Sequence, residues 1–212
     1  MVPALIEISP SGILGDLSVP AEARGLVIFA HGSGSSRLSS RNRFVASVLQ
    51  RSGFATLLLD LLTAEEEKVD LKTRHLRFDI DLLARRLVEA TEWASGQETL
   101  KNLRIGYFGA STGAAAALIA AAELPERTGA VVSRGGRPDL AGTALPLVQA
   151  PTLLIVGGDD HMVIRLNQQA IAELQCEKKL EIIHGATHLF EEPGALEQVA
   201  EVASNWLKHL SR

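Results

Sequence analysis

A serine bracketed by two glycines is the first feature of this sequence that could do covalent chemistry. Ser111 stands in the stretch FGASTG, between Gly109 and Gly113. This G-x-S-x-G spacing lets a strand turn abruptly into a helix, because a larger side chain at either glycine would clash across the turn. A serine on such a turn acts as a nucleophile when a neighbouring base accepts its proton. The alternative is that Ser111 only caps the Ala-rich helix that follows.

An acid and a base further along the chain could complete such a site. Asp159 and Asp160 follow the apolar stretch PTLLIV, and either carboxylate could hold a histidine ring. His188 lies deep in the loop before the last predicted helix, whereas His184 directly follows a strand, where a structural hydrogen bond is the simpler role. Serine, aspartate and histidine then occur in the chain order used on the α/β-hydrolase scaffold.

The stretch HGATH also places two histidines four residues apart, as zinc-binding helices do. It lacks the glutamate of H-E-x-x-H, and Gly185 within it disfavours a helix, so we predict no metal site. Cys176 is the only cysteine. It excludes an intrachain disulfide and a cysteine-rich metal site, and we interpret it as a packed small hydrophobic residue.

Strand and helix patterns alternate along the chain, which predicts a mostly parallel central sheet with helices on both faces, as one α/β domain over residues 1–212. In such a sheet, ligands bind beyond the carboxyl ends of the strands. The acidic stretch 64–70 is predicted to be a solvated loop. The apolar runs predict strands at 4–9, 12–19, 25–30, 55–62, 103–109, 129–133, 151–158 and 179–185, and helices at 41–53, 77–95, 111–124, 165–175 and 194–210.

Taken together, these motifs resemble an α/β-hydrolase of the dienelactone-hydrolase-like group, over nearly the whole chain. The elbow lies between a strand and an Ala-rich helix and is followed by Gly-x-x-Asp and Gly-x-x-His. The resemblance implies Ser111 as nucleophile, Asp160 as acid and His188 as base. The family pattern Gly-x-x-Asp-x-x-Val favours Asp160 over Asp159. Dienelactone hydrolases carry cysteine in the elbow, so the serine is a departure from that enzyme.

The resemblance also implies an oxyanion hole made by two backbone N–H groups, those of Ser33 and Thr112. His31 and Gly32 then shape the loop HGSGSS that carries Ser33. The alternative, a glycine loop that cradles phosphate, is weaker because HGSGSSR matches neither G-x-x-x-x-G-K-[ST] nor G-x-G-x-x-G.

Arginines gather in two segments that should border the mouth of the site. A guanidinium there could hold a substrate carboxylate or phosphate, although loop arginines often pair with a local acid such as Asp139. Arg134 and Arg137 are the candidate substrate-binding residues. The two segments contribute Arg37, Arg41, Arg43, Arg134 and Arg137.

Composition limits the remaining function classes. A net charge of −4 without a basic tract excludes a general nucleic-acid binder, and no apolar run approaches the roughly 18 residues of a membrane span. We therefore expect an unexported, cytoplasmic protein with a small-molecule partner. The oligomeric state is not predicted.

The expected activity is hydrolysis of a small carboxylic ester, lactone or thioester through an acyl-enzyme, without a cofactor. The short segment between residues 133 and 151 predicts a minimal cap or none, and hence a shallow, open pocket. Two alternatives remain: an acyltransferase on the same scaffold, and a non-enzymatic binding protein that keeps the fold.

Overall fold

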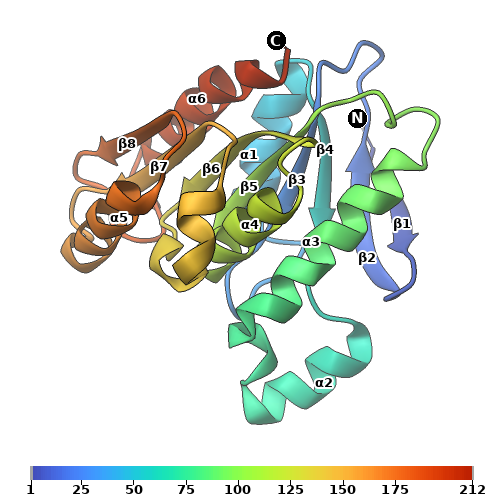
Figure 1. Ribbon diagram of the computed structural model, residues 1–212, viewed down its shortest axis with the longest axis horizontal. Coiled ribbons are helices and arrows are strands. Elements are labelled where there is room, and N and C mark those ends of the chain that lie inside the picture. Colours follow the sequence, from blue (N-terminus) through green and yellow to red (C-terminus); the bar gives the residue numbers. More distant parts are fainter. Residues whose placement is uncertain (1, 212) are drawn as a thin grey trace.

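An eight-stranded sheet runs through the molecule in the order β1-β2-β4-β3-β5-β6-β7-β8 (Figure 1). The computed structural model describes residues 2–211. The strands are β1 Ala4–Ile8, β2 Ile13–Ser18, β3 Leu26–Ala30, β4 Ala55–Leu59, β5 Ile105–Ala110, β6 Thr128–Arg134, β7 Thr152–Gly157 and β8 Lys178–Ile183. The helices are α1 Ser40–Arg51, α2 Ala64–Thr73, α3 Ile80–Ser95, α4 Thr112–Glu123, α5 His161–Glu173 and α6 Ala195–Trp206, with 3₁₀ segments η1 Leu76–Phe78, η2 Pro138–Leu147 and η3 Leu207–Ser211.

The sheet is parallel from β4 to β8 and antiparallel only where β1 and β2 join it. Every residue of β3 to β7 is buried, as expected for strands covered on both faces, and their sequences are mostly apolar. The predicted mostly parallel α/β sheet is therefore confirmed. All the parallel strands end at the same edge, where the predicted chemical residues lie.

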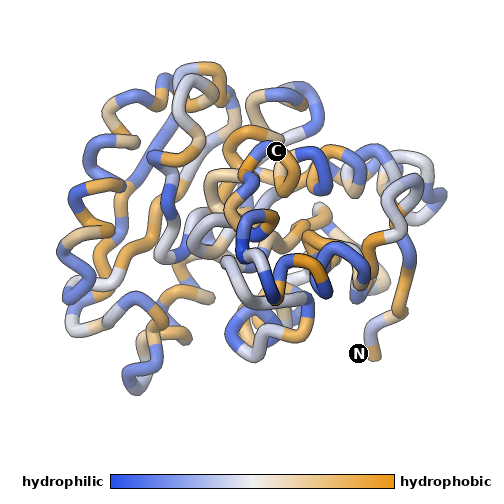
Figure 2. Tube along the Cα trace, turned by 90° about the horizontal axis from the view of Figure 1, so that it is seen from below, coloured by the Kyte–Doolittle hydropathy of each residue, from blue (hydrophilic) through white to orange (hydrophobic). Residues whose placement is uncertain are grey.

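Helices cover both faces of the sheet (Figure 1). Helices α1 and α6 bury Val45, Leu49 and Val199 against one face, and α3, α4 and α5 cover the other. Helix α4 packs tightly on the sheet, since Ala114 to Ala117 are completely buried and carry only a methyl group each. Figure 2 shows apolar segments through the interior and alternating polar and apolar residues along the outer helices, the pattern of one-sided burial.

The prediction of a solvated loop over the acidic stretch 64–70 is wrong, because this stretch forms helix α2. A capping box starts this helix: the Thr63 N–H donates to Glu66 Oε2 at 2.7 Å, and the Glu66 N–H donates to Thr63 Oγ1 at 3.2 Å. The negative charges of the three glutamates in its first turn stabilise the helix, because the amino end of the helix dipole is positive. Its apolar residues Val69 and Leu71 stay exposed, so the sequence shows little amphipathic periodicity.

Between β6 and β7 the chain forms only η2, so the minimal cap predicted from that short segment is confirmed.

Helix α2 extends away from the main body at the carboxyl edge of β4 (Figure 1). Among residues 2–211, no helix combines the length and apolar character that a bilayer span requires.

Candidate active site

Ser111 occupies a strained turn between β5 and α4. Its backbone has φ 50° and ψ −121°, a conformation that non-glycine residues rarely adopt. The Ser111 N–H donates to the Arg134 carbonyl at 3.3 Å, and the Ser111 carbonyl accepts from the Arg137 N–H at 3.0 Å. Two backbone hydrogen bonds to one neighbouring segment thus hold the serine on its turn.

The glycines of the elbow are required by close packing. A Cβ on Gly109 would lie 2.4 Å from the Ala114 Cα, and one on Gly113 would lie 2.4 Å from the Ala30 carbonyl oxygen. Both distances are far below van der Waals contact. The close approach at Gly113 also brings the first turn of α4 against the end of β3, where the loop HGSGSS begins.

Asp160 and His188 form a direct pair. Asp160 Oδ2 lies 2.7 Å from His188 Nδ1, and Asp160 Oδ1 also caps α5 by accepting from the Val163 N–H at 3.4 Å. Asp159, the competing acid, is exposed. The Asp160 contact orients the His188 ring with Nδ1 toward the carboxylate and Nε2 away from it.

A glycine that sequence analysis used only as a spacing marker positions the histidine loop. A Cβ on Gly157 would lie 2.4 Å from the Ala186 carbonyl oxygen and 2.5 Å from that of Thr187. The last residue of β7 therefore packs directly against the loop that carries His188. The signal in the sequence was the GG pair that ends PTLLIVGG.

His184, the competing histidine, is exposed and lies outside the pocket that holds Ser111. Within the described residues, no group of three His, Cys, Asp or Glu side chains could hold a metal ion, so His184 and His188 are not part of such a group.

The predicted oxyanion donors lie at the ends of β3 and β5. Thr112 is the first residue of α4, so its N–H has no acceptor within the helix. Across residues 2–211, the Ser33 N–H also has no backbone acceptor. A Cβ on Gly32 would lie 3.0 Å from the Ser111 Cβ, so the Ser33 loop passes directly beside the serine. Two N–H groups are thus available next to Ser111.

His31 has a structural role in this loop. The Leu61 N–H donates to His31 Nε2 at 3.1 Å, so the proton of the neutral ring is on Nδ1, which donates to the Gly32 carbonyl at 2.9 Å. Burial lowers the pKa of His31, although the Gly32 carbonyl and Asp60 act in the opposite direction. The neutral ring therefore fixes the start of the loop HGSGSS.

Ser111 and His188 line one pocket of about 240 Å³. Its wall includes Ser33 and the buried side chains of Arg134 and Asn42. Sequence analysis did not identify Asn42 or Ser39 as pocket residues. Ser39 was a signal in the sequence for this end of the pocket, because a serine before an amphipathic run predicts the amino end of a helix.

The five arginines near the mouth are bound very differently. Arg137 is held by both carboxylate oxygens of Asp139 at 2.8–3.2 Å and is absent from the pocket wall. Arg134 lines the pocket and is 8% exposed. The other three have acidic partners: Arg37 pairs with Asp16 and Asp60, Arg43 with Asp16, and Arg41 with Glu191.

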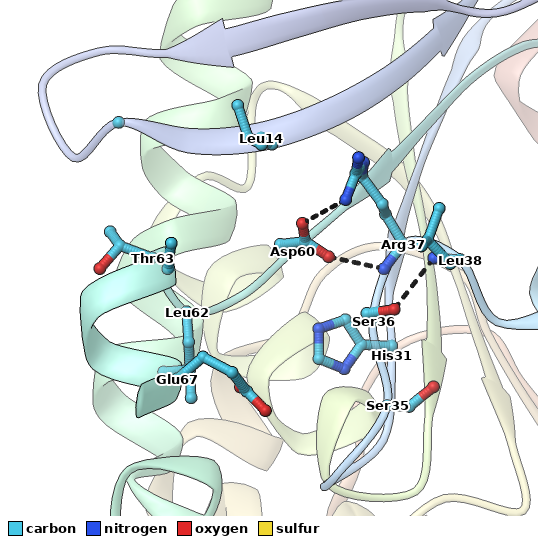
Figure 3. Close-up of a pocket in the computed structure, with 12 residues that line it drawn as sticks. Leu14, His31, Ser35, Ser36, Arg37, Leu38, Asp60, Leu62, Thr63 and Glu67 are labelled. Carbon is cyan, nitrogen blue, oxygen red and sulfur yellow. Dashed lines mark hydrogen bonds and ion pairs between the residues drawn. The ribbon is translucent and has the colours of Figure 1, made fainter. Parts of the chain in front are cut away.

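A larger cavity, of about 440 Å³, is lined in part by His31, Ser35 and Ser36 of the HGSGSS loop (Figure 3). Leu14, Leu38 and Leu62 line it, and Asp60 accepts hydrogen bonds from Arg37 in its wall. Neither Ser111 nor His188 contributes to it, but Ser35 lines both cavities. The two spaces therefore adjoin at Ser35.

Comparison with known proteins agrees with this architecture. The model of the dienelactone hydrolase family matches residues 13–211. The chain belongs to the dienelactone hydrolase family. The crystal structure of dienelactone hydrolase from Anabaena variabilis is 60% identical with a TM-score of 0.96, and the match covers 99% of this chain and 97% of that one. The expected resemblance is thereby confirmed.

Two further proteins are similar to this chain, one in fold and one in sequence. Est1E from Butyrivibrio proteoclasticus, at 16% identity and a TM-score of 0.81 over the whole of both chains, shares the fold. A Mycobacterium tuberculosis protein named "Putative phosphoribosyl transferase" is 58% identical over 95% of this chain. The chain spans only 45% of that protein's length. The name thus describes a protein more than twice as long as the segment that matches.

Proposed function

We propose that this member of the dienelactone hydrolase family is a serine hydrolase that cleaves small carboxylic esters, lactones or thioesters. The observation that carries the proposal is the Asp160–His188 hydrogen bond at 2.7 Å in a structure where His188 and the strained Ser111 share one pocket. A binding protein requires neither the strain nor the pair. Family membership supports ester hydrolysis, and the chain's own residues supply each role that acyl transfer to serine requires.

The reaction proceeds in two stages. His188 Nε2 accepts the Ser111 hydroxyl proton as Oγ attacks the ester carbonyl, and Asp160 stabilises the imidazolium. The N–H groups of Ser33 and Thr112 donate to the oxyanion of the tetrahedral intermediate. His188 then protonates the leaving alcohol, which leaves an acyl group on Ser111. A water molecule, deprotonated by His188, releases the acid and restores the serine.

The pocket favours small substrates. About 240 Å³ beside Ser111 accommodates a short acyl or alcohol group, and the adjoining cavity with its three leucines offers apolar space for the other part. The phosphoribosyl transferase name belongs to a longer protein, of which this chain matches 45%.

Labelling with a fluorophosphonate tests the proposal. Wild-type protein should gain the mass of one phosphonyl group on Ser111, and folded Ser111→Ala should gain none. Ser47→Ala, on the outer part of α1, serves as the matched control and should label like wild type. Labelling of Ser111→Ala at the wild-type rate would refute the proposal. Product analysis with p-nitrophenyl butyrate in water and in added alcohol separates hydrolysis from acyl transfer.

A further inference from the structure

Arg134 carries a buried positive charge that pairs with no acidic side chain in the described part of the chain. Its Nε and Nη1 atoms are buried and have no hydrogen-bond partner among residues 2–211. Burial, and then the charge of Arg41, lower the pKa of Arg134 to about 10, so the guanidinium remains charged at neutral pH. A buried charge is costly unless an opposite charge or hydrogen bonds compensate it. The pocket is thus electrostatically suited to an anion.

The amino end of α1 meets the same pocket. Ser39, Arg41 and Asn42 all line it, and α1 is 12 residues long. The Ser39 hydroxyl accepts only the Asn42 N–H, at 3.3 Å, so the N–H groups of Ser40 and Arg41 have no acceptor within the helix. Free N–H groups and the positive end of the helix dipole form a recognised anion site.

Of the residues that the structure describes, none that lines the pocket carries a carboxylate side chain. Arg41 shares its charge with Glu191, whose side chain is 65% exposed, so Arg134 and the helix end supply the surplus positive charge. Donors reach the pocket from two directions: the end of β6 and the start of α1. Such a spread suits a tetrahedral group with three oxygens and a charge of about −1.5 to −2 better than a planar carboxylate.

We infer that this pocket holds a phosphate monoester group of the substrate, bound by Arg134 and the amino end of α1. This inference rests on the proposed function, because it places the phosphate on the ester that the enzyme cleaves. Since Ser111 and His188 line the same space of about 240 Å³, only a short linker can separate the phosphate from the ester. The substrate class is therefore a small phosphorylated ester.

Binding of inorganic phosphate to Ser111→Ala, measured by isothermal titration calorimetry, tests the site without catalysis. Adding Arg134→Gln should weaken binding at least about tenfold, because a charge-assisted contact is lost. Arg137→Gln is the matched control, since Asp139 already holds that arginine. Arg134→Lys keeps the charge and should bind with intermediate affinity, which guards against a misfolded glutamine variant. Equal affinity of all these proteins, or no binding at millimolar phosphate, would overturn the inference.

Hydrolysis provides the second test. Wild type should cleave the butyrate ester of glycol phosphate with a kcat/KM roughly tenfold or more above that of the neutral glycol ester, and Arg134→Gln should abolish the difference. The butyrate ester of glycolate carries a carboxylate in place of the phosphate. If wild type cleaves it as well as or better than the phosphate ester, the phosphate assignment is overturned. Active esterase that binds no phosphate refutes this inference alone. Phosphate binding without fluorophosphonate labelling supports the anion site and refutes the proposed function.

Discussion

The Asp160 carboxylate and the His188 ring lie 2.7 Å apart, between Oδ2 and Nδ1, while the adjacent Asp159 is exposed. Asp160→Asn should lower kcat for p-nitrophenyl butyrate by roughly 10³ to 10⁴, because an amide neither holds the same ring tautomer nor stabilises its cation. Asp159→Asn should stay within about tenfold of wild type. The reverse ranking would assign the acid role to Asp159. Asparagine also caps helices, so both variants should unfold at similar temperatures.

Strain at Ser111 predicts an unusual order of stabilities. Glycine tolerates φ 50° and ψ −121°, whereas alanine keeps the Cβ clash. Ser111→Gly should therefore exceed Ser111→Ala in free energy of unfolding by about 1 kcal/mol, despite the greater chain entropy of unfolded glycine. Urea unfolding followed by circular dichroism measures both. An alanine variant as stable as the glycine variant would show that the turn is not strained.

The buried His31 ring predicts a pH dependence of stability. Its folded pKa lies below the ordinary value of 6.5, so the unfolded chain binds the proton more tightly. The free energy of unfolding should thus fall as pH drops below about 6.5, by at most about 1.4 kcal/mol per pH unit. His31→Gln should flatten this slope between pH 7 and pH 5, and the exposed His75→Gln should not. Parallel slopes for wild type and His31→Gln would contradict the prediction.

Removing the Arg134 charge should stabilise the protein in phosphate-free buffer. Burial lowers the pKa of Arg134 to about 10, which corresponds to a cost of roughly 3 kcal/mol for the charged form. This cost is fully present below pH 10 and relieved only as pH rises above it. Arg134→Met should raise the free energy of unfolding at pH 7.5 by about 1 to 3 kcal/mol. Arg137→Met, which breaks an ion pair, should not. Destabilisation by Arg134→Met would mean that the guanidinium is compensated in the free protein.

Much of the fold was predictable because its signals are local. Continuous apolar runs identify buried parallel strands, and the elbow glycines identify the turn at Ser111. The helix at α2 escaped prediction because its capping box was not recognised and its apolar residues remain exposed. The composition of a short polar stretch does not distinguish a solvated loop from a solvated helix.

Contacts between distant segments set the remaining limits of prediction. The segment SRGGRPD places an acid two residues after Arg137, but it does not show which arginine faces the site until the end of β6 and the start of α1 meet at one pocket. Arg134 then lines the pocket, while Arg137 turns back to Asp139 two residues away. Likewise, the choice between Asp159 and Asp160 depends on the position of His188, 28 residues beyond Asp160.

The order of the strands has a consequence for biosynthesis. Strands β5, β6, β7 and β8 join one edge of the sheet in the order in which they are synthesised. Each new strand therefore finds its partner already in place, and the sheet can grow as the nascent chain emerges. The Ser111 turn gains its backbone hydrogen bonds once β6 and the segment to Arg137 have joined the sheet, but His188 follows the last strand. A nascent chain should thus acquire a folded elbow early and reactivity toward phosphonates only when synthesis has passed β8.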